Sequence, residues 1–357
     1  MPIFSHAENY NHEQVVFCRN DDVGLRAIVA IHDTTLGPAL GGCRFYPYAS
    51  EADALRDVLR LSRGMTYKAS CAGLNLGGGK AVIIGNPRTD KSEGLLRAFG
   101  QFVDSLGGRY ITAEDSGTSV ADMDLINMET EHVCGVSAYA GGSGDPSPVT
   151  AWGVFHGIRA AADTVFGSPE LSGRTVAVQG VGNVGYHLVK YLHEVGARAV
   201  VTDVDSERID RVVSEFGAEV VGLDDIYGVD CDVFAPCALG GVLNDDTIPQ
   251  LKVPIIAGGS NNVLDNMAGH GAMLRERGIL YAPDYVINAG GLINVYAEIQ
   301  GAPREKALRD AEGIFATLKS IFATAKQHGI TTAEAANHVA EARIAKIGGL
   351  SKFTRTR

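Results

Sequence analysis

Hydrophobic and polar positions along the chain follow two alternating rhythms. Apolar runs bounded by turn residues predict strands, and the runs at 12–19 and 26–33, joined by the polar segment 20–24, predict an antiparallel hairpin. Apolar residues that recur every three or four positions predict amphipathic helices over 51–67 and 91–106. The first part of the chain therefore mixes a hairpin with strand–helix units, which favours a mixed sheet.

After residue 149 the pattern becomes a regular alternation of strand and helix. Strands are expected at 174–179, 199–202, 219–221, 231–235, 253–257 and 279–282. Such alternation is typical of a parallel sheet with helices on both faces. The sequence therefore predicts an α/β protein of two domains, an N-terminal α/β substrate domain with a mixed sheet and a C-terminal Rossmann-type doubly wound domain.

The clearest linker is the segment 141–148, which contains three glycines and two prolines and cannot form a regular element. It sets the expected domains at 1–145 for substrate binding, catalysis and oligomerisation, and at 146–331 for dinucleotide binding. A final helical pattern within 332–357 is expected to pack back on the first domain.

Composition narrows the functional classes. The chain has 357 residues and a net charge of -11, and this acidic balance argues against nucleic acid or an anionic membrane as a partner. No apolar run approaches the ~18 residues of a membrane span, and the N-terminus lacks a signal peptide, so a cytoplasmic protein is expected. The six cysteines include no Cys-x-x-Cys pair, and no metal site is predicted.

A glycine-rich segment at 180–185 follows one predicted strand and opens the next helix. It reads Gly-x-Gly-x-x-Gly, and Asp203 stands 18 residues after its last glycine at the end of the next strand. This combination predicts a dinucleotide site, because the glycines admit a pyrophosphate to the helix N-terminus. Asp203 would accept hydrogen bonds from the adenosine ribose and repel a 2′-phosphate, which favours NAD over NADP. A plain turn role for Asp203 before the helix 206–216 remains the alternative.

A second glycine-rich segment, 74–80, ends at Lys80, and its three glycines predict a tight turn and allow another group to approach the backbone closely. A Walker loop is excluded, because Leu74 and Ala81 occupy positions where that motif needs glycine and a hydroxyl residue. Lys80 then begins a buried apolar strand, where an ammonium group is costly unless it is paired. Lys68, expected just after the helix 51–67, lies twelve residues earlier, and both lysines could point into one cleft.

An acidic pair, Glu114 and Asp115, follows the predicted strand 109–113. Acids at the carboxyl end of such a strand lie where ligands bind, and only one of two neighbours should face the ligand. Asp115 could instead cap the helix 120–129. The glycine-rich segment 36–42 is expected to be a loop, serving either as a bend or as a wall against a ligand.

Two lysines and a carboxylate suit an α-amino acid as the substrate. One ammonium group can hold the substrate carboxylate, and a second lysine can act as a base once burial and a neighbouring cation lower its pKa. A carboxylate can hold the substrate amine. Lys68, Lys80 and Asp115 fit these roles, in a cleft between the two domains.

These motifs resemble the glutamate/leucine/phenylalanine/valine dehydrogenase family over nearly the whole chain. The segment 74–87 is similar to the active-site signature of that family. Within the family, the chain most resembles the leucine-specific members. The residues that carry the resemblance are Gly77, Gly78, Lys80, Val82, Asn86 and Pro87, together with the segments 30–42, 63–68, 110–115 and 285–291.

The resemblance implies reversible, NAD-dependent oxidative deamination of branched-chain L-amino acids (L-leucine, L-isoleucine and L-valine) to 2-oxo acids and ammonia. It assigns carboxylate binding to Lys68, activation of water to Lys80 and the amine protons to Asp115. The implied substrate contacts are Leu40, Gly41, Gly42, Met65, Ala113, Asn262, Leu292 and Val295. The implied cofactor contacts are Gly180, Val181, Gly182, Asn183, Val184, Gly185, Asp203, Thr150, Cys237, Ala238 and Asn262. A homo-octamer is also implied.

Four positions depart from the pattern expected of the family, namely Cys43, Ser116, Gly259 and Val263. They affect the expected side-chain preference and loop rigidity, not the reaction. Two alternatives remain open. One is a phenylalanine, valine or tryptophan dehydrogenase, since a methylene in an apolar pocket is worth only about 1–3 kcal/mol. The other is a non-catalytic NAD-binding protein.

Overall fold

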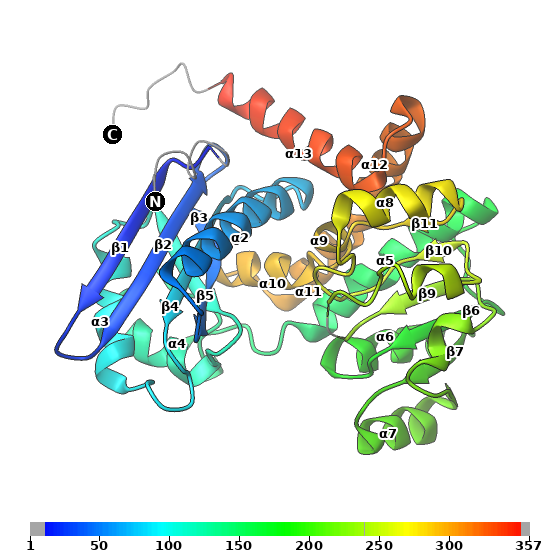
Figure 1. Ribbon diagram of the computed structural model, residues 1–357, viewed down its shortest axis with the longest axis horizontal. Helices are drawn as coiled ribbons and strands as arrows, with labels where there is room; N and C mark the ends of the chain where they lie inside the picture. Colours follow the sequence, from blue (N-terminus) through cyan, green and yellow to red (C-terminus); the bar gives the residue numbers. More distant parts are fainter. Residues whose placement is uncertain (1–10, 239, 351–357) are drawn as a thin grey trace. The chain divides into compact units, whose positions relative to one another are not determined.

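The computed structural model describes residues 11–238 and 240–350, which form two compact units (Figure 1). Of the described residues, the first unit comprises 11–144, 298–301 and 340–350, and the second comprises 145–238, 240–297 and 302–339. The segment 298–301 thus belongs with the N-terminal part of the chain. Of the expected final helix, residues 351–357 lie outside the described part.

The first unit is built on a mixed five-stranded sheet in the order β1-β2-β4-β3-β5. Its strands are β1 (Gln14–Asn20), β2 (Leu25–Asp33), β3 (Ala39–Tyr46), β4 (Gly77–Ile84) and β5 (Tyr110–Glu114). The β1–β2 hairpin and the β2–β4 pair are antiparallel, whereas β3 runs parallel to both β4 and β5. The predicted hairpin and mixed sheet are confirmed.

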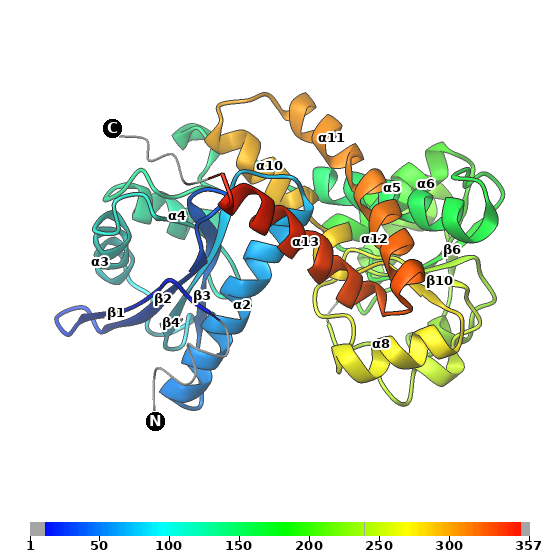
Figure 2. The same cartoon turned by 90° about the horizontal axis from the view of Figure 1, so that it is seen from above.

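Helices cover both faces of this sheet (Figure 2). The helix α2 (Glu51–Cys71) packs on the face that contains Ile28, Ala30 and Val82. The opposite face packs against α3 (Glu93–Asp104) and α4 (Val120–Asn127). Since side chains alternate along a strand, Lys80 lies on the α2 face together with Val82.

The glycines of the first unit correct two predictions. Gly77, Gly78 and Gly79 lie inside β4 instead of forming a turn, and Gly41 and Gly42 lie inside β3 instead of a loop. None of them has a positive φ. A Cβ at Gly78 would overlap the Thr66 amide of α2. These glycines therefore provide close approach between strands and helix, which their sequence cannot distinguish from turn formation.

The end of α2 also differs from the prediction. The helix continues to Cys71, so Lys68 lies in its last turn and not after it. The C-terminal part of α13 (Thr332–Gly348), which belongs to the first unit from Ala340, holds this end. Arg343 donates to the Leu74 carbonyl at 2.7 Å, and the Ser70 hydroxyl donates to the Ala340 carbonyl at 2.9 Å.

The second unit contains a six-stranded, fully parallel sheet in the order β11-β10-β9-β6-β7-β8. This is the order of two mononucleotide-binding halves, and it confirms the predicted doubly wound fold. The strands are β6 (Thr175–Gln179), β7 (Arg198–Thr202), β8 (Glu219–Val220), β9 (Val233–Pro236), β10 (Ile255–Ile256) and β11 (Leu280–Tyr281). The order reverses between β6 and β9, where such sheets bind ligands.

The remaining helices complete the two units. They are η1 (Ala138–Ala140), α5 (Ser147–Phe166), α6 (Asn183–Glu194), α7 (Ser206–Phe216), η2 (Asp225–Gly228), η3 (Ile248–Gln250), α8 (Met267–Glu276), α9 (Asp284–Ile287), α10 (Gly290–Ile299), α11 (Arg304–Glu312) and α12 (Ile314–His328). Within residues 11–238 and 240–350, no helix combines the length and apolar character that a membrane span requires.

Candidate active site

Lys80 occupies a buried position on β4, and only 6% of it is exposed. Its Nζ atom donates to Oδ2 of Asp115, the residue that follows β5. A buried ammonium group is stable only when a partner compensates for lost hydration, and Asp115 provides that partner. The structure thus brings together two of the three predicted catalytic residues.

Burial lowers the pKa of Lys80 to about 7, and the positive charges of Arg44 and Lys68 act in the same direction. The Asp115 carboxylate opposes the shift, because it favours the charged ammonium form. A lysine with this pKa can exchange a proton near neutral pH, which an ordinary lysine cannot. Lys68, the third predicted catalytic residue, is half-buried on α2 and contributes to the electrostatics of this group.

Asp115 is held in a turn and does not cap the following helix. Its Oδ1 atom accepts the Ser116 amide at 2.5 Å, and its own amide donates to the Thr118 hydroxyl at 2.8 Å. The N-cap of α4 is Ser119, whose amide donates to Asp122 at 2.8 Å. The capping alternative for Asp115 is therefore wrong, and the neighbouring Glu114 is exposed.

The sequence prediction missed two charged residues of this cluster. Arg44 on β3 donates to Asp57 of α2 at 2.9 Å and lies 3.5 Å from Oδ1 of Asp115. Arg44 stands opposite Val82 in the strand register, which places it on the same sheet face as Lys80. Asp57 precedes Lys68 by eleven residues, or about three helical turns. That spacing is a signal in the sequence that could have indicated a shared helix face.

The predicted substrate contacts of the first unit lie beside this cluster. Leu40 and Ala113 are buried, and Met65 is half-buried on α2. A Cβ at Gly41 would overlap the Gly79 carbonyl and lie 3.3 Å from Met65. A Cβ at Gly42 would lie 2.9 Å from Asp115. Protein atoms therefore fill the space where a side chain would lie at Gly41 and Gly42. The close packing of the strands alone requires glycine at these two positions, whether or not a ligand contacts them.

The second unit presents the predicted glycine loop at the end of β6. Gly180 has a φ of 91°, and a Cβ at Gly185 would overlap the Gly180 carbonyl. In contrast, a Cβ at Gly182, the N-cap of α6, would meet only the Arg208 guanidinium at 3.4 Å. Gly180 and Gly185 thus shape the loop, while Gly182 leaves an accessible surface at the helix N-terminus, where phosphate binds favourably.

Asp203 follows β7 and ties the glycine loop to that strand. Its Oδ2 atom accepts the Val181 amide at 2.7 Å, and its Oδ1 atom accepts the Asp205 amide at 3.0 Å. Each carboxylate oxygen retains further acceptor capacity for a ribose hydroxyl. The N-cap of α7 is Asp205 and not Asp203.

A cavity of about 390 Å³ opens beside this loop. Arg208, Arg211 and Lys190 provide positive charge around it, and none of the three was predicted as a site residue. Asp145, Val181, Gly182, Asn183, Tyr186 and His187 complete the lining. An anionic pyrophosphate fits this combination of a helix N-terminus and basic side chains.

The other predicted cofactor contacts of the second unit lie where strands end or helices begin. Cys237 and Ala238 follow β9, and Cys237 donates its amide to the Gln179 carbonyl at 2.7 Å. Asn183 and Val184 begin α6, and Thr150 lies in the first turn of α5. Asn262 follows β10 with a φ of 50°. The predicted substrate contacts Leu292 and Val295 lie on α10, the former buried.

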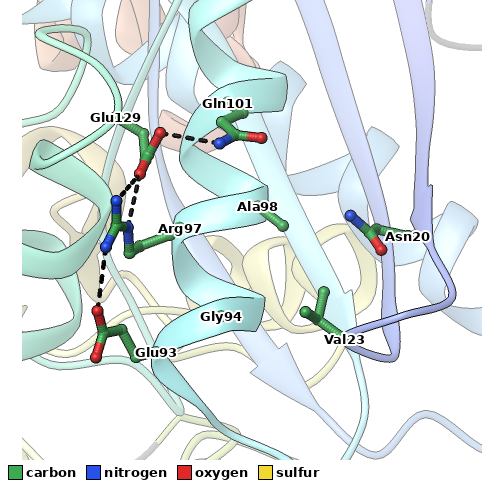
Figure 3. A pocket seen from close by; sticks show the side chains of 8 residues that line it. All are labelled: Asn20, Val23, Glu93, Gly94, Arg97, Ala98, Gln101 and Glu129. Carbon is green, nitrogen blue, oxygen red and sulfur yellow. Dashed lines mark hydrogen bonds and ion pairs between the residues drawn. The ribbon is translucent and has the colours of Figure 1, made fainter.

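A different cavity of about 470 Å³ lies in the first unit between α3 and the tip of the β1–β2 hairpin (Figure 3). Its charged groups satisfy one another, since Arg97 pairs with Glu93 at 3.2 Å and with Glu129 at 2.6 Å. It contains none of the predicted site residues. In the part of the chain that the structure describes, no cluster of three or more metal-binding side chains occurs.

Comparison with known families decides the class. Residues 12–132 match the family described as Glu/Leu/Phe/Val dehydrogenase, dimerisation domain, and residues 141–209 and 202–357 match Glutamate/Leucine/Phenylalanine/Valine dehydrogenase. The chain belongs to this family. It is an oxidoreductase of the amino-acid dehydrogenase class, and the family is nicotinamide-dependent. The alternative of a non-catalytic dinucleotide-binding protein is thereby set aside.

Individual relatives in this family cover almost the whole chain. Leucine dehydrogenase of Geobacillus stearothermophilus is 58% identical over 96% of this chain and 94% of its own. L-tryptophan dehydrogenase of Nostoc punctiforme is 53% identical over 96% of both chains. A crystal structure of L-tryptophan dehydrogenase from Nostoc punctiforme superposes with a TM-score of 0.88 at 50% identity, covering 96% of this chain and 99% of the other.

Proposed function

We propose that the protein catalyses the reversible, NAD-dependent oxidative deamination of branched-chain L-amino acids to 2-oxo acids and ammonia. The observation that carries this proposal is the buried Lys80, paired with Asp115 and with a pKa lowered to about 7. The similarity to leucine dehydrogenases at 54–58% identity supports the substrate class.

The three charged residues take distinct roles in this proposal. The Lys68 ammonium binds the substrate carboxylate. A bound nicotinamide would supply the acceptor for a hydride from the substrate α-carbon. Neutral Lys80 would take a proton from the water that attacks the resulting iminium carbon. Asp115 would hold the amine and exchange its protons, so that the C–N bond breaks and ammonia leaves. Cys43 does not disturb this arrangement, because it lies in the core on the opposite face of the sheet.

Selection of NAD is proposed to rest on Asp203. The residues present fit the dinucleotide, since the α6 N-terminus, the exposed face of Gly182 and the basic cavity lining can hold its pyrophosphate. Asp203 would accept the adenosine ribose hydroxyls and repel a 2′-phosphate. Thr150, Cys237, Ala238 and Asn262 remain proposed contacts of the nicotinamide half.

Selection among amino acids is proposed to rest on apolar side chains. The proposed contacts are Leu40, Gly41, Gly42, Met65, Ala113, Asn262, Leu292 and Val295. An aromatic substrate is the second candidate, because tryptophan and phenylalanine dehydrogenases are 53% and 50% identical to this chain. The assembly is proposed to be a homo-octamer, which sedimentation velocity would test.

A substrate panel tests the proposal directly. NAD reduction at alkaline pH is measured with L-leucine, L-isoleucine, L-valine, L-phenylalanine, L-tryptophan and L-glutamate, each also with NADP. We expect the highest kcat/KM with the three aliphatic amino acids and NAD. Fastest turnover of an aromatic substrate would retain the mechanism and overturn the aliphatic specificity. No reduction with any member would overturn the proposed function.

A further inference from the structure

Arg44 connects two carboxylates that come from different elements. Its Nη1 atom donates to Asp57 of α2 at 2.9 Å, and its Nη2 atom lies 3.5 Å from Oδ1 of Asp115. All three side chains are at most 23% exposed, so these contacts are shielded from solvent. The buried Nε atom of Arg44 has no hydrogen-bond partner among the described residues, so the guanidinium is held through its Nη atoms, which contact the two carboxylates.

Asp57 is anchored independently of Arg44. The Tyr48 hydroxyl donates to Asp57 at 2.7 Å, and Arg60 pairs with its other oxygen at 3.1 Å. Although burial acts in the opposite direction, these donors together with Arg44 keep the pKa of Asp57 below its usual value. Asp57 is therefore a fixed negative charge that holds one end of the Arg44 guanidinium.

The Asp115 carboxylate consequently interacts with two cations, Lys80 and Arg44. Its Oδ2 atom accepts from Lys80, while its Oδ1 atom faces Arg44 and accepts the Ser116 amide. A carboxylate that paired with Lys80 alone would stabilise the ammonium form more strongly, because no second cation would offset its charge. The Arg44 contact thus limits how firmly Asp115 retains the Lys80 proton.

We propose that Arg44 is a positioning residue for the dehydrogenation: shared between Asp57 and Asp115, it orients the Asp115 carboxylate and keeps Lys80 able to lose its proton. This role rests on the proposed function. Arg44 acts through Asp115 and Lys80.

The charges around Lys80 agree with this role. On its own face of the sheet, Lys80 has the charged neighbours Arg44 on β3, Lys68 and Asp57 on α2, and Asp115 at the end of β5. The Cys43 thiol of β3 lies on the opposite face. Opposite Lys80 on β2 stands the uncharged Ala30. After burial, Arg44 contributes more than Lys68 to lowering the pKa of Lys80, whereas Asp57 raises it. Removal of Arg44 and removal of the Asp57 charge should therefore act in opposite directions.

The test is the pH dependence of kcat/KM for L-leucine oxidation with saturating NAD. Arg44→Met should move the acidic limb to higher pH by about one unit, as expected for loss of a nearby charge. Asp57→Asn should move the limb to lower pH. Arg44→Lys should keep the limb close to that of the wild type while lowering kcat, because a single ammonium group cannot bridge two carboxylates as a guanidinium does.

Arg97→Met is the matched control, since this arginine pairs with Glu93 and Glu129 at the separate cavity. It should leave the limb in place. If Arg44→Met and Asp57→Asn lower activity but leave the limb where it is in the wild type, Arg44 is merely structural and the proposal is overturned. A wild-type enzyme that oxidises none of the amino acids overturns the proposed function first, and this role with it.

A second measurement does not depend on turnover. Acetylation of Lys80 by acetic anhydride, followed by peptide mass spectrometry across pH 5–10, reports directly on the neutral amine. The midpoint should rise in Arg44→Met and fall in Asp57→Asn. Equal midpoints in both variants and the wild type would contradict the proposal. If Arg44→Met does not fold, Asp57→Asn should still lower the midpoint while Arg44→Lys leaves it near the wild-type value, and an unchanged midpoint in Asp57→Asn would contradict the proposal.

Discussion

The two units differ in the groups that they offer to a charged ligand. The first unit gathers the ionisable side chains of Lys80, Asp115, Arg44 and Asp57 on one buried face of a sheet. The second unit relies on backbone amides at the start of α6, with Asp203 fastening the glycine loop. A buried side-chain cluster can change its protonation, whereas backbone amides cannot. The first unit is therefore suited to chemistry and the second to binding.

The largest effect on activity is expected when the reacting side chain of the first unit, that of Lys80, is removed. Lys80→Ala should lower kcat by about 10²–10⁴-fold, the usual contribution of a general base. Binding of NADH, measured by fluorescence titration, should stay within twofold of the wild type, because the glycine loop belongs to the second unit. Turnover near the wild-type value would mean that Lys80 is not the base.

The glycine loop offers a matched pair of variants. Gly185→Ala forces a methyl group against the Gly180 carbonyl, so both Tm and NADH affinity should fall, with a cost of about 1–3 kcal/mol. Gly182→Ala meets no backbone atom within 4 Å, so Tm should be unchanged while NADH affinity falls. Unchanged affinity in Gly182→Ala would show that the dinucleotide does not approach this glycine.

The same contrast explains what could be predicted from the sequence. The second unit's site follows from spacing, because the strand, the three glycines and Asp203 occupy one continuous segment. In the first unit, Lys68, Lys80 and Asp115 could be predicted, but Arg44 and Asp57 depend on strand register and helix phase. The sequence indicates that a group can approach the glycines of 74–80 closely, but it places them in a turn and those of 36–42 in a loop, because only the packed structure shows that they lie in β4 and β3.

Cofactor preference should change by a smaller amount. Asp203→Asn keeps a side-chain acceptor for the Val181 amide but removes the charge, so the ratio of kcat/KM for NAD over NADP should fall about tenfold. Asp205→Asn, at the N-cap of α7, is the control and should leave the ratio unaltered. A ratio that Asp203→Asn does not change would argue against the ribose contact.

The smallest effect concerns stability in the first unit. Burial, assisted by His32, lowers the pKa of His12 from 6.5 to about 4. The unfolded chain binds a proton as pH falls below 6.5, while the folded chain does so only near 4, so stability decreases over that window. In His12→Gln, the loss of unfolding free energy between pH 6.5 and 4 should be smaller by about 1–2 kcal/mol, a value that allows for the partial exposure of His12. Hydrogen exchange of the β2 amides at pH 6.5 and 4.5 would measure it, and an equal pH dependence in both proteins would contradict it.

The division of the first unit into three segments has a consequence for synthesis. N-terminal domains commonly fold first as a chain is made. Here the strands and α2 appear early, but the hydrogen bonds that fix the α2 end come from Ala340 and Arg343. The second unit, which ends at residue 339, can thus be complete while the first still lacks its closing helix. The end of α2, which carries Lys68, is therefore fixed only after Ala340 and Arg343 have been made.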